Sequence, residues 1–114
     1  MGLDQWAGLR QSDGEVEDRF SWRKHYSLQR LMFTEFHKQN KDKDPNGKLE
    51  FNSGEGGVNI TTEILQKLKE AIENDYEEFD YEVHYWTKKQ DEEFVSWAEN
   101  ALKDGKEVGY DCCW

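Results

Sequence analysis

Oxygen-bearing side chains cluster between residues 42 and 53, at a spacing typical of a calcium-binding loop. Asp42, Asp44 and Asn46 occupy the first, third and fifth positions of the twelve-residue pattern, and Glu50 occupies the ninth. Hard cations prefer carboxylate and amide oxygens, and Gly47 at the sixth position permits the sharp turn that gathers them. The spacing therefore predicts a cation site, with calcium as the ion.

The second half of this loop departs from the pattern. Ser53 stands at the twelfth position, where a calcium loop carries a bidentate glutamate, and Pro45 is unusual at the fourth. With Glu50 or Glu55 supplying the missing carboxylate, the expected calcium site is weak and incomplete. The alternative is a plain turn between a helix and a strand, in which Asp and Asn side chains bond their own backbone.

Charged and aromatic residues near both ends of the chain form a second constellation. If the two termini pair beside the first long helix, an ammonium, a guanidinium and two indoles would surround one pocket suited to an anionic or planar ligand. The residues are Gly2, Asp4, Trp22, Arg23, Lys24, Tyr110 and Trp114. The structural alternative is that Asp4 pairs with Arg23 while the tryptophans fill the end of the core.

An acidic stretch with interleaved aromatic residues follows residue 72. Aromatic anchors within a charged surface are typical of protein-binding sites, and acidic charge fits a basic partner. The acidic surface consists of Glu73, Asp75, Glu77, Glu78, Asp80 and Glu82. The alternative is a solvated charged face whose aromatic rings belong to the core.

Composition limits the classes of function. The 114 residues include 25 acidic against 15 basic side chains, giving a net charge of −10, which disfavours direct binding of nucleic-acid phosphates. No apolar run is long enough for a membrane span, so no membrane contact is expected. The adjacent Cys112 and Cys113 and the scattered histidines lack metal-site spacing. No arrangement of nucleophile and base is recognisable, which favours a non-enzymatic protein without a required cofactor.

Hydrophobic periodicity predicts the elements that would position these residues. Residues 21–40 are expected to form the central helix, capped by Ser21, with His25, Leu28, Met32 and Phe36 on its buried face. Tyr26, Leu31 and Phe33 are expected to widen that face.

Two further helices are predicted, from Thr61 to about residue 74 and from Thr87 to the terminator Gly105. Residues 3–10 and 106–114 are expected to be strands, and residues 48–52 a short strand. The expected fold is a single α+β domain over residues 1–114: three helices with a small antiparallel sheet that pairs the N- and C-terminal strands.

The ends and the helices together resemble a family of small, uncharacterised bacteriophage proteins that begin Met-Gly-Leu-Asp. The matching segments are residues 1–4, 22–24, the helices from Thr61 and Thr87, and residues 110–114. Cys112-Cys113 and the loop at 42–52 depart from the family pattern. Some members carry a phosphoglycerate kinase label, which a chain of this length without a phosphate-binding loop does not support physically.

The resemblance implies a phage origin and action in the host cytoplasm. We therefore expect a non-enzymatic accessory protein that binds a basic host protein through its acidic, aromatic surface. The alternative is a domain that binds a small ligand or a cation, through the pocket at residues 22–24 or the loop at 42–52. Neither expectation specifies an oligomeric state.

Overall fold

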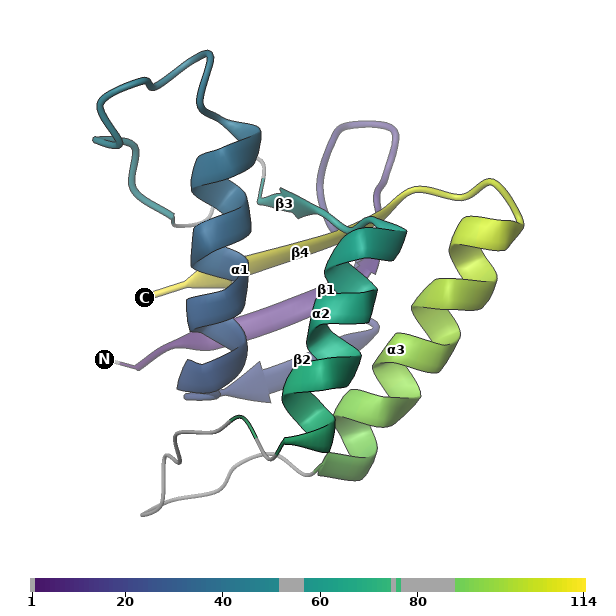
Figure 1. Ribbon diagram of the computed structural model, residues 1–114. Coiled ribbons are helices and arrows are strands. Elements are labelled where there is room, and N and C mark those ends of the chain that lie inside the picture. Colours follow the sequence, from purple (N-terminus) through teal and green to yellow (C-terminus); the bar gives the residue numbers. More distant parts are fainter. Residues whose placement is uncertain (1, 52–56, 75, 77–87) are drawn as a thin grey trace.

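The computed structural model describes residues 2–51, 57–74, 76 and 88–114, in which three helices lie against one face of a four-stranded sheet (Figure 1). In chain order the elements are β1 (Asp4–Leu9), β2 (Phe20–Arg23), α1 (Tyr26–Gln39), β3 (Val58–Asn59), α2 (Thr62–Glu73), α3 (Lys88–Lys103) and β4 (Val108–Cys113).

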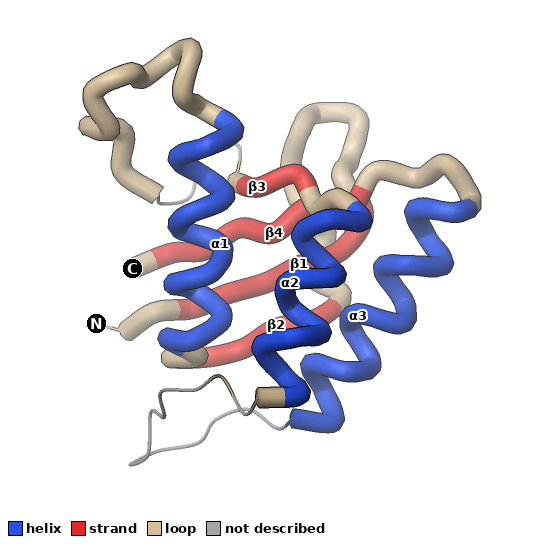
Figure 2. Tube along the Cα trace, viewed as in Figure 1, coloured by secondary structure: helices blue, strands red, loops and turns tan. Residues whose placement is uncertain are grey.

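The sheet has the strand order β2-β1-β4-β3, and every neighbouring pair is antiparallel. The two terminal strands lie in its centre: β1 pairs with β4 along its whole length, from Asp4 opposite Cys113 to Leu9 opposite Val108. Both chain ends consequently lie side by side (Figure 2). The predicted α+β class and the predicted pairing of the termini are confirmed.

The predicted start of the central helix is wrong. Ser21 belongs to strand β2, where Trp22 lies opposite Gln5 of β1 and points into the core. Lys24 then adopts a left-handed conformation (φ 55°), which ends the strand and redirects the chain. The helix α1 begins at Tyr26, and the cap is His25, whose ring accepts a hydrogen bond from the Leu28 amide at 3.3 Å.

The other two helices match their predictions. Thr61 caps α2 by accepting the Ile64 amide at 3.2 Å, and α2 ends before Asn74. Gly105 follows α3 with φ 78°, the left-handed conformation expected of a helix terminator. The capping residue Thr87 lies outside the described residues. Residues 48–51 are not a strand, contrary to prediction, and residue 52 is not described.

The core lies between the helices and the sheet. Leu28, Met32 and Phe36 of α1 are fully buried there, as predicted. The predicted wider stripe is wrong for Tyr26 and Phe33, which are 40% and 48% exposed. The other two helices contribute Ile64, Leu65, Leu68 and Ile72 from α2 and Phe94, Val95, Ala98 and Ala101 from α3.

Glutamine side chains bond the backbone at both outer strands. The Gln39 side chain accepts from the Asn59 amide of β3 at 2.8 Å and donates to its carbonyl at 2.7 Å. At the opposite edge the Gln90 amide of α3 donates to the Ser21 carbonyl of β2 at 2.5 Å. The helices are thus tied to the two margins of the sheet as well as to its face.

Gly57 enters β3 in a position that only glycine fits. Its φ is 65°, and a Cβ atom there would lie 2.3 Å from the Tyr110 carbonyl oxygen. The close approach of the two backbones lets Val58 pair with Tyr110 in the sheet.

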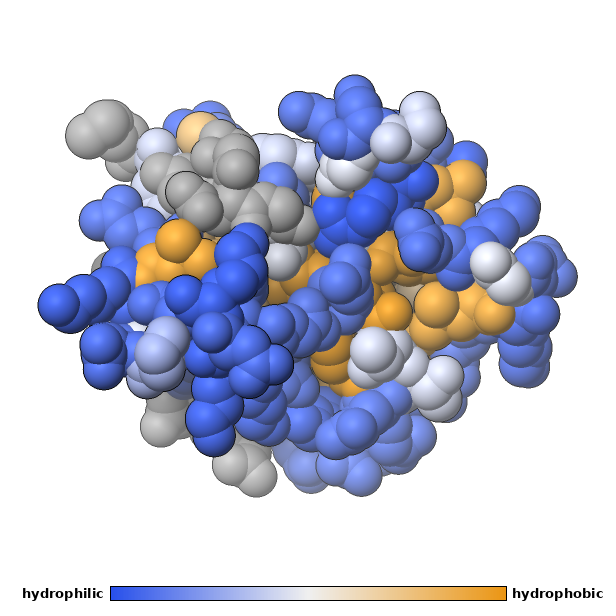
Figure 3. Space-filling view, turned by 90° about the horizontal axis from the view of Figure 1, so that it is seen from above, coloured by the Kyte–Doolittle hydropathy of each residue, from blue (hydrophilic) through white to orange (hydrophobic). Residues whose placement is uncertain are grey.

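The face of the molecule seen from above is mainly hydrophilic. Seen from above, hydrophobic residues show only between charged and polar ones (Figure 3), in keeping with the mean hydropathy of −1.10. Within the described ranges, no helix combines the length and apolar character needed to cross a bilayer.

Candidate functional site

A carboxylate sits at the centre of a buried polar cluster that joins four segments of the chain. Asp91 of α3 is 1% exposed, and its Oδ1 accepts the Trp22 indole N–H at 2.7 Å. Its Oδ2 lies 2.7 Å from His25 Nε2 and also accepts the Tyr76 hydroxyl. Three donors around one carboxylate offset the cost of burying its charge.

The cluster fixes the tautomer of His25. Its Nδ1 accepts the Leu28 amide proton, so the ring proton is on Nε2 and faces Asp91. Both ring nitrogens are therefore committed, and the imidazole has no free lone pair with which to accept a proton from a substrate. With His25 fully buried, the geometry of this pair is that of a structural link between α1 and α3.

A second buried polar cluster links the two central strands, β1 and β4, to α1. Gln5 donates from its amide to the Tyr110 hydroxyl at 2.8 Å, and Tyr110 donates to Gln29 Oε1 at 2.6 Å. Gln29 in turn donates to Cys112 Sγ at 3.2 Å. Burial raises the pKa of the Tyr110 hydroxyl well above its usual range and the pKa of the Cys112 thiol to about 11. Cys112 is thus a protonated thiol at neutral pH, without the character of a nucleophile.

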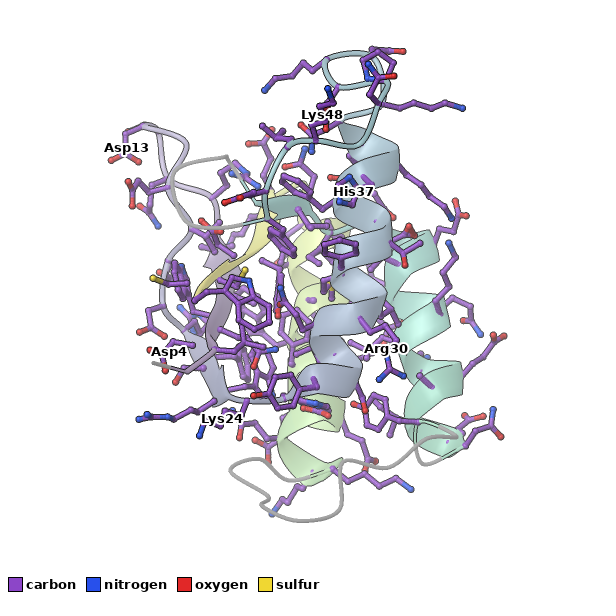
Figure 4. All side chains as sticks on the ribbon, turned by 90° about the vertical axis from the view of Figure 1, so that its left-hand side faces the viewer. Asp4, Asp13, Lys24, Arg30, His37 and Lys48 are labelled. Carbon is purple, nitrogen blue, oxygen red and sulfur yellow. The ribbon has the colours of Figure 1, made fainter. Side chains whose placement is uncertain are left out.

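The members of the constellation predicted from the termini are divided between the core, the surface of the sheet and the chain end. All of its members lie within the described residues. Trp22 and Tyr110 are buried, with their ring centres 6.3 Å apart in the core. Asp4 and Arg23 are exposed cross-strand neighbours. Asp4 and Lys24 lie on the sheet side of the molecule, far from Lys48 (Figure 4). Trp114 contacts a different part of the chain, where its indole N–H donates to the Phe51 carbonyl at 3.2 Å.

The predicted calcium loop forms a turn held by its own carboxylate. The two oxygens of Asp44 accept the Lys48 amide at 3.0 Å and the Leu49 amide at 2.6 Å. These backbone hydrogen bonds, the Leu49 one foremost, lower the pKa of the Asp44 carboxyl below its ordinary value. Asp42, Asn46 and Glu50 are exposed. Within the described part of the chain, no three His, Cys, Asp or Glu side chains gather closely enough to hold a metal ion. Calcium binding at this loop stays a prediction.

Of the predicted acidic surface, Glu73 is exposed at the end of α2, whereas Asp75, Glu77, Glu78, Asp80 and Glu82 lie outside the described residues. Glu73 borders a pocket of about 220 Å³ between α2 and α3, which we call the α2–α3 groove. Its lining residues are Lys69, Ile72, Glu73, Glu92, Val95, Ser96 and Glu99.

A larger pocket, of about 430 Å³, lies beside the C-terminal half of α1 and is called the Trp114 groove. It is lined by Phe33, His37, Gly47, Lys48, Leu49, Glu50, Phe51 and Trp114. Phe33 and Trp114 expose 48% and 54% of their surface, so two large apolar side chains meet solvent at one place. In Figure 4, His37 near the end of α1 lies close to Lys48 of the following loop.

The sequence interpretation missed the residues that join the buried clusters. Asp91 shares a helical face with Phe94, Val95 and Ala98, and this spacing was the available signal that it is buried. Gln29 likewise lies one residue from Leu28 on the buried side of α1. Apart from Tyr76, 15 residues before Asp91, the partners that satisfy these polar groups are 66 to 83 residues away, beyond the reach of any local pattern.

Comparison of the chain with models of protein families, with curated proteins and with solved structures gave no match in any of the three. Function is therefore inferred from the side chains themselves.

Proposed function

We propose that this chain is a non-enzymatic accessory protein of a bacteriophage that binds a basic protein in the host cytoplasm. The α2–α3 groove carries the proposal, because it combines an apolar floor with an acidic rim. Ile72 and Val95 form the floor, and Glu73, Glu92 and Glu99 contribute three carboxylates against the single ammonium of Lys69.

The one cation of this rim is already engaged. Lys69 Nζ lies 3.5 Å from Glu99 Oε2 across the groove, so Glu73 and Glu92 are the carboxylates that an incoming cation would meet. A volume of about 220 Å³ is below the range of pockets for small molecules, and suits one or two side chains of a partner instead. Lysine and arginine fit this combination, since their aliphatic stems cover apolar surface while their charged ends reach carboxylates.

The net charge of −10 supports the same class of partner over a longer range. An acidic field attracts a basic surface, raises the rate of encounter and weakens as salt is added. Because Glu73 leads directly into the acidic sequence at residues 75–82, the groove is continuous in sequence with the acidic surface expected from composition.

Photo-crosslinking from the groove tests this proposal. Ser96 is exposed and lines the groove, so a photoreactive amino acid at this position would capture a bound partner from a host-cell lysate. The expected product is a complex with a basic protein that forms at low salt and is lost as salt screens the charges.

Two charge-reversal variants provide the matched comparison. Glu73→Lys with Glu92→Lys should abolish the crosslink, whereas Asp104→Lys with Glu107→Lys, which changes net charge equally after the end of α3, should retain it. A crosslink that survives Glu73→Lys/Glu92→Lys, or one that is insensitive to salt, would contradict the proposal.

A further inference from the structure

The Trp114 groove has the dimensions and lining of a site for a small molecule, separate from the α2–α3 groove. Its volume of about 430 Å³ falls within the range of about 300–1,000 Å³ typical of ligand pockets. Its walls are mainly aromatic and apolar, with charged side chains only at Lys48 and Glu50 and an imidazole at His37. Such a lining, with a few polar groups to orient the ligand, is the usual composition of a binding site.

The aromatic walls are held in place by contacts with the core and with one another. The Phe51 ring stacks on Phe36 of the core, with 4.5 Å between ring centres and an angle of 11°. The Phe33 ring meets the His37 ring edge to face at 4.5 Å, and the Trp114 indole is oriented by its hydrogen bond to the Phe51 carbonyl. Fixed walls reduce the entropy lost when a ligand binds.

The loop that forms the opposite wall of the groove is held by hydrogen bonds within residues 44–49. The Asp44 carboxylate holds the amides of Lys48 and Leu49, while the Gly47 amide donates to the Asp44 carbonyl at 3.1 Å. These bonds fix residues 47–49 opposite α1, so Asp44 positions the groove without lining it. Asp44, which belongs to the predicted cation site, thus shapes the groove by fixing this loop.

The exposed aromatic rings indicate which class of ligand the groove would bind. Three large hydrophobic side chains of the described chain are exposed, and Phe33 and Trp114 of this groove are two of them; Tyr26 lies elsewhere on α1. Aromatic faces bind other aromatic rings by stacked or edge-to-face contact, in addition to the apolar area that they bury. We propose that the Trp114 groove binds a small planar aromatic molecule against Phe33 and Trp114, with its polar substituent at the rim beside Lys48 and Glu50.

Titration with matched small probes tests this site. Phenylacetate, phenethylamine and benzyl alcohol present one ring with an anionic, a cationic and a neutral substituent, the charges that Lys48 and Glu50 can distinguish. Their cyclohexyl counterparts keep the size and charge but lack the planar ring. At least one aromatic probe should bind saturably, with a dissociation constant of about 1 mM or tighter, and shift the Trp114 indole N–H signal in nuclear magnetic resonance spectra.

Three variants locate the binding. Phe33→Ala and Trp114→Ala should each weaken the affinity roughly tenfold or more, in keeping with loss of one aromatic contact and its buried area. Both side chains are about half exposed, so the fold should survive, and circular dichroism verifies this. Tyr26→Ala removes an exposed ring from the same helix outside the groove and should leave the affinity unchanged.

Three outcomes would each overturn the site: equal binding of the cyclohexyl probes, unchanged affinity in Phe33→Ala and Trp114→Ala, or no binding by any aromatic probe. Each leaves the proposed α2–α3 contact untouched, because none of the altered residues lines that groove.

Discussion

The imidazole of His25 and the carboxylate of Asp91 join the first turn of α1 to the first turn of α3, with 2.7 Å between Nε2 and Oδ2. His25 caps α1 through its other nitrogen, so one side chain both starts a helix and connects it to another. Trp22 of β2 and Tyr76 beyond α2 donate to the same carboxylate. Asp91 therefore couples β2, the start of α1 and the turn after α2 to α3 at a single buried point.

Replacing Asp91 with alanine should destabilise the protein by about 3 kcal/mol or more, because it leaves the buried N–H groups of Trp22 and His25 without an acceptor. Urea unfolding followed by circular dichroism measures this loss. Tyr76→Phe, which removes one donor and keeps the acceptor, should cost only about 1 kcal/mol. Comparable losses in the two variants would contradict the central role of the carboxylate.

The free energy of unfolding should fall as pH rises above about 9. Burial raises the pKa of the Cys112 thiol from 9.0 to about 11 and raises the pKa of the Tyr76 and Tyr110 hydroxyls above 10.0. The folded state therefore keeps protons that the unfolded chain releases, so this stabilisation is complete below pH 9 and is lost progressively at higher pH. Urea titrations from neutral pH to about pH 11 measure the slope.

The variant Cys112→Ala separates the contribution of the thiol to this pH dependence from that of the Tyr76 and Tyr110 hydroxyls. Since the thiol of the unfolded chain ionises first, this variant should lose less stability than the unaltered protein between about pH 9 and pH 10. The two curves should become parallel again only above about pH 11, where the thiol ionises in the folded protein as well. Identical slopes over the whole range would show that the Cys112 thiol is not protected by burial.

Gly57→Ala should be far more destabilising than Gly14→Ala, although both glycines have positive φ. At Gly14, with φ 88°, nothing lies within 4 Å of an added Cβ, so only the backbone strain of about 1–2 kcal/mol is expected. At Gly57 the added atom would lie 2.3 Å from the Tyr110 carbonyl, which must move and disturb the pairing of β3 with β4. Thermal unfolding of the two variants compares them directly, and similar midpoints would refute the contact.

Local sequence patterns predicted correctly those elements whose spacing and caps are set by neighbouring residues. The apolar spacing and Thr61 cap of α2, the Gly105 terminator of α3 and the presence of a strand near the C-terminus all coincide with the structure. Ser21 was misassigned because serine before an apolar run also fits a helix cap, whereas in the structure Ser21 pairs with Trp6 of β1, and the Trp22 indole bonds Asp91, 69 residues later. Lysine in a left-handed conformation at position 24 has no signature in sequence.

The candidate grooves could be predicted only in part. Glu73 was assigned to an acidic surface from composition, and it does border the α2–α3 groove. Trp114 was predicted as a pocket residue, but its neighbours in the Trp114 groove were not, because the walls come from α1, the loop at 47–51 and the chain end, three segments that only the tertiary fold brings together. Phe33 was assigned to the core because helical periodicity alone does not show where the buried stripe ends.

The glutamine contacts at the margins of the sheet restrict how copies of this chain can associate. An open strand edge is a template on which another chain can add a strand and begin a fibril. At β3, Gln39 already bonds both backbone groups of Asn59, and at β2, Gln90 bonds the Ser21 carbonyl. An incoming strand would have to displace these side chains at both edges, so growth by strand addition is disfavoured and contacts through helices and loops are favoured.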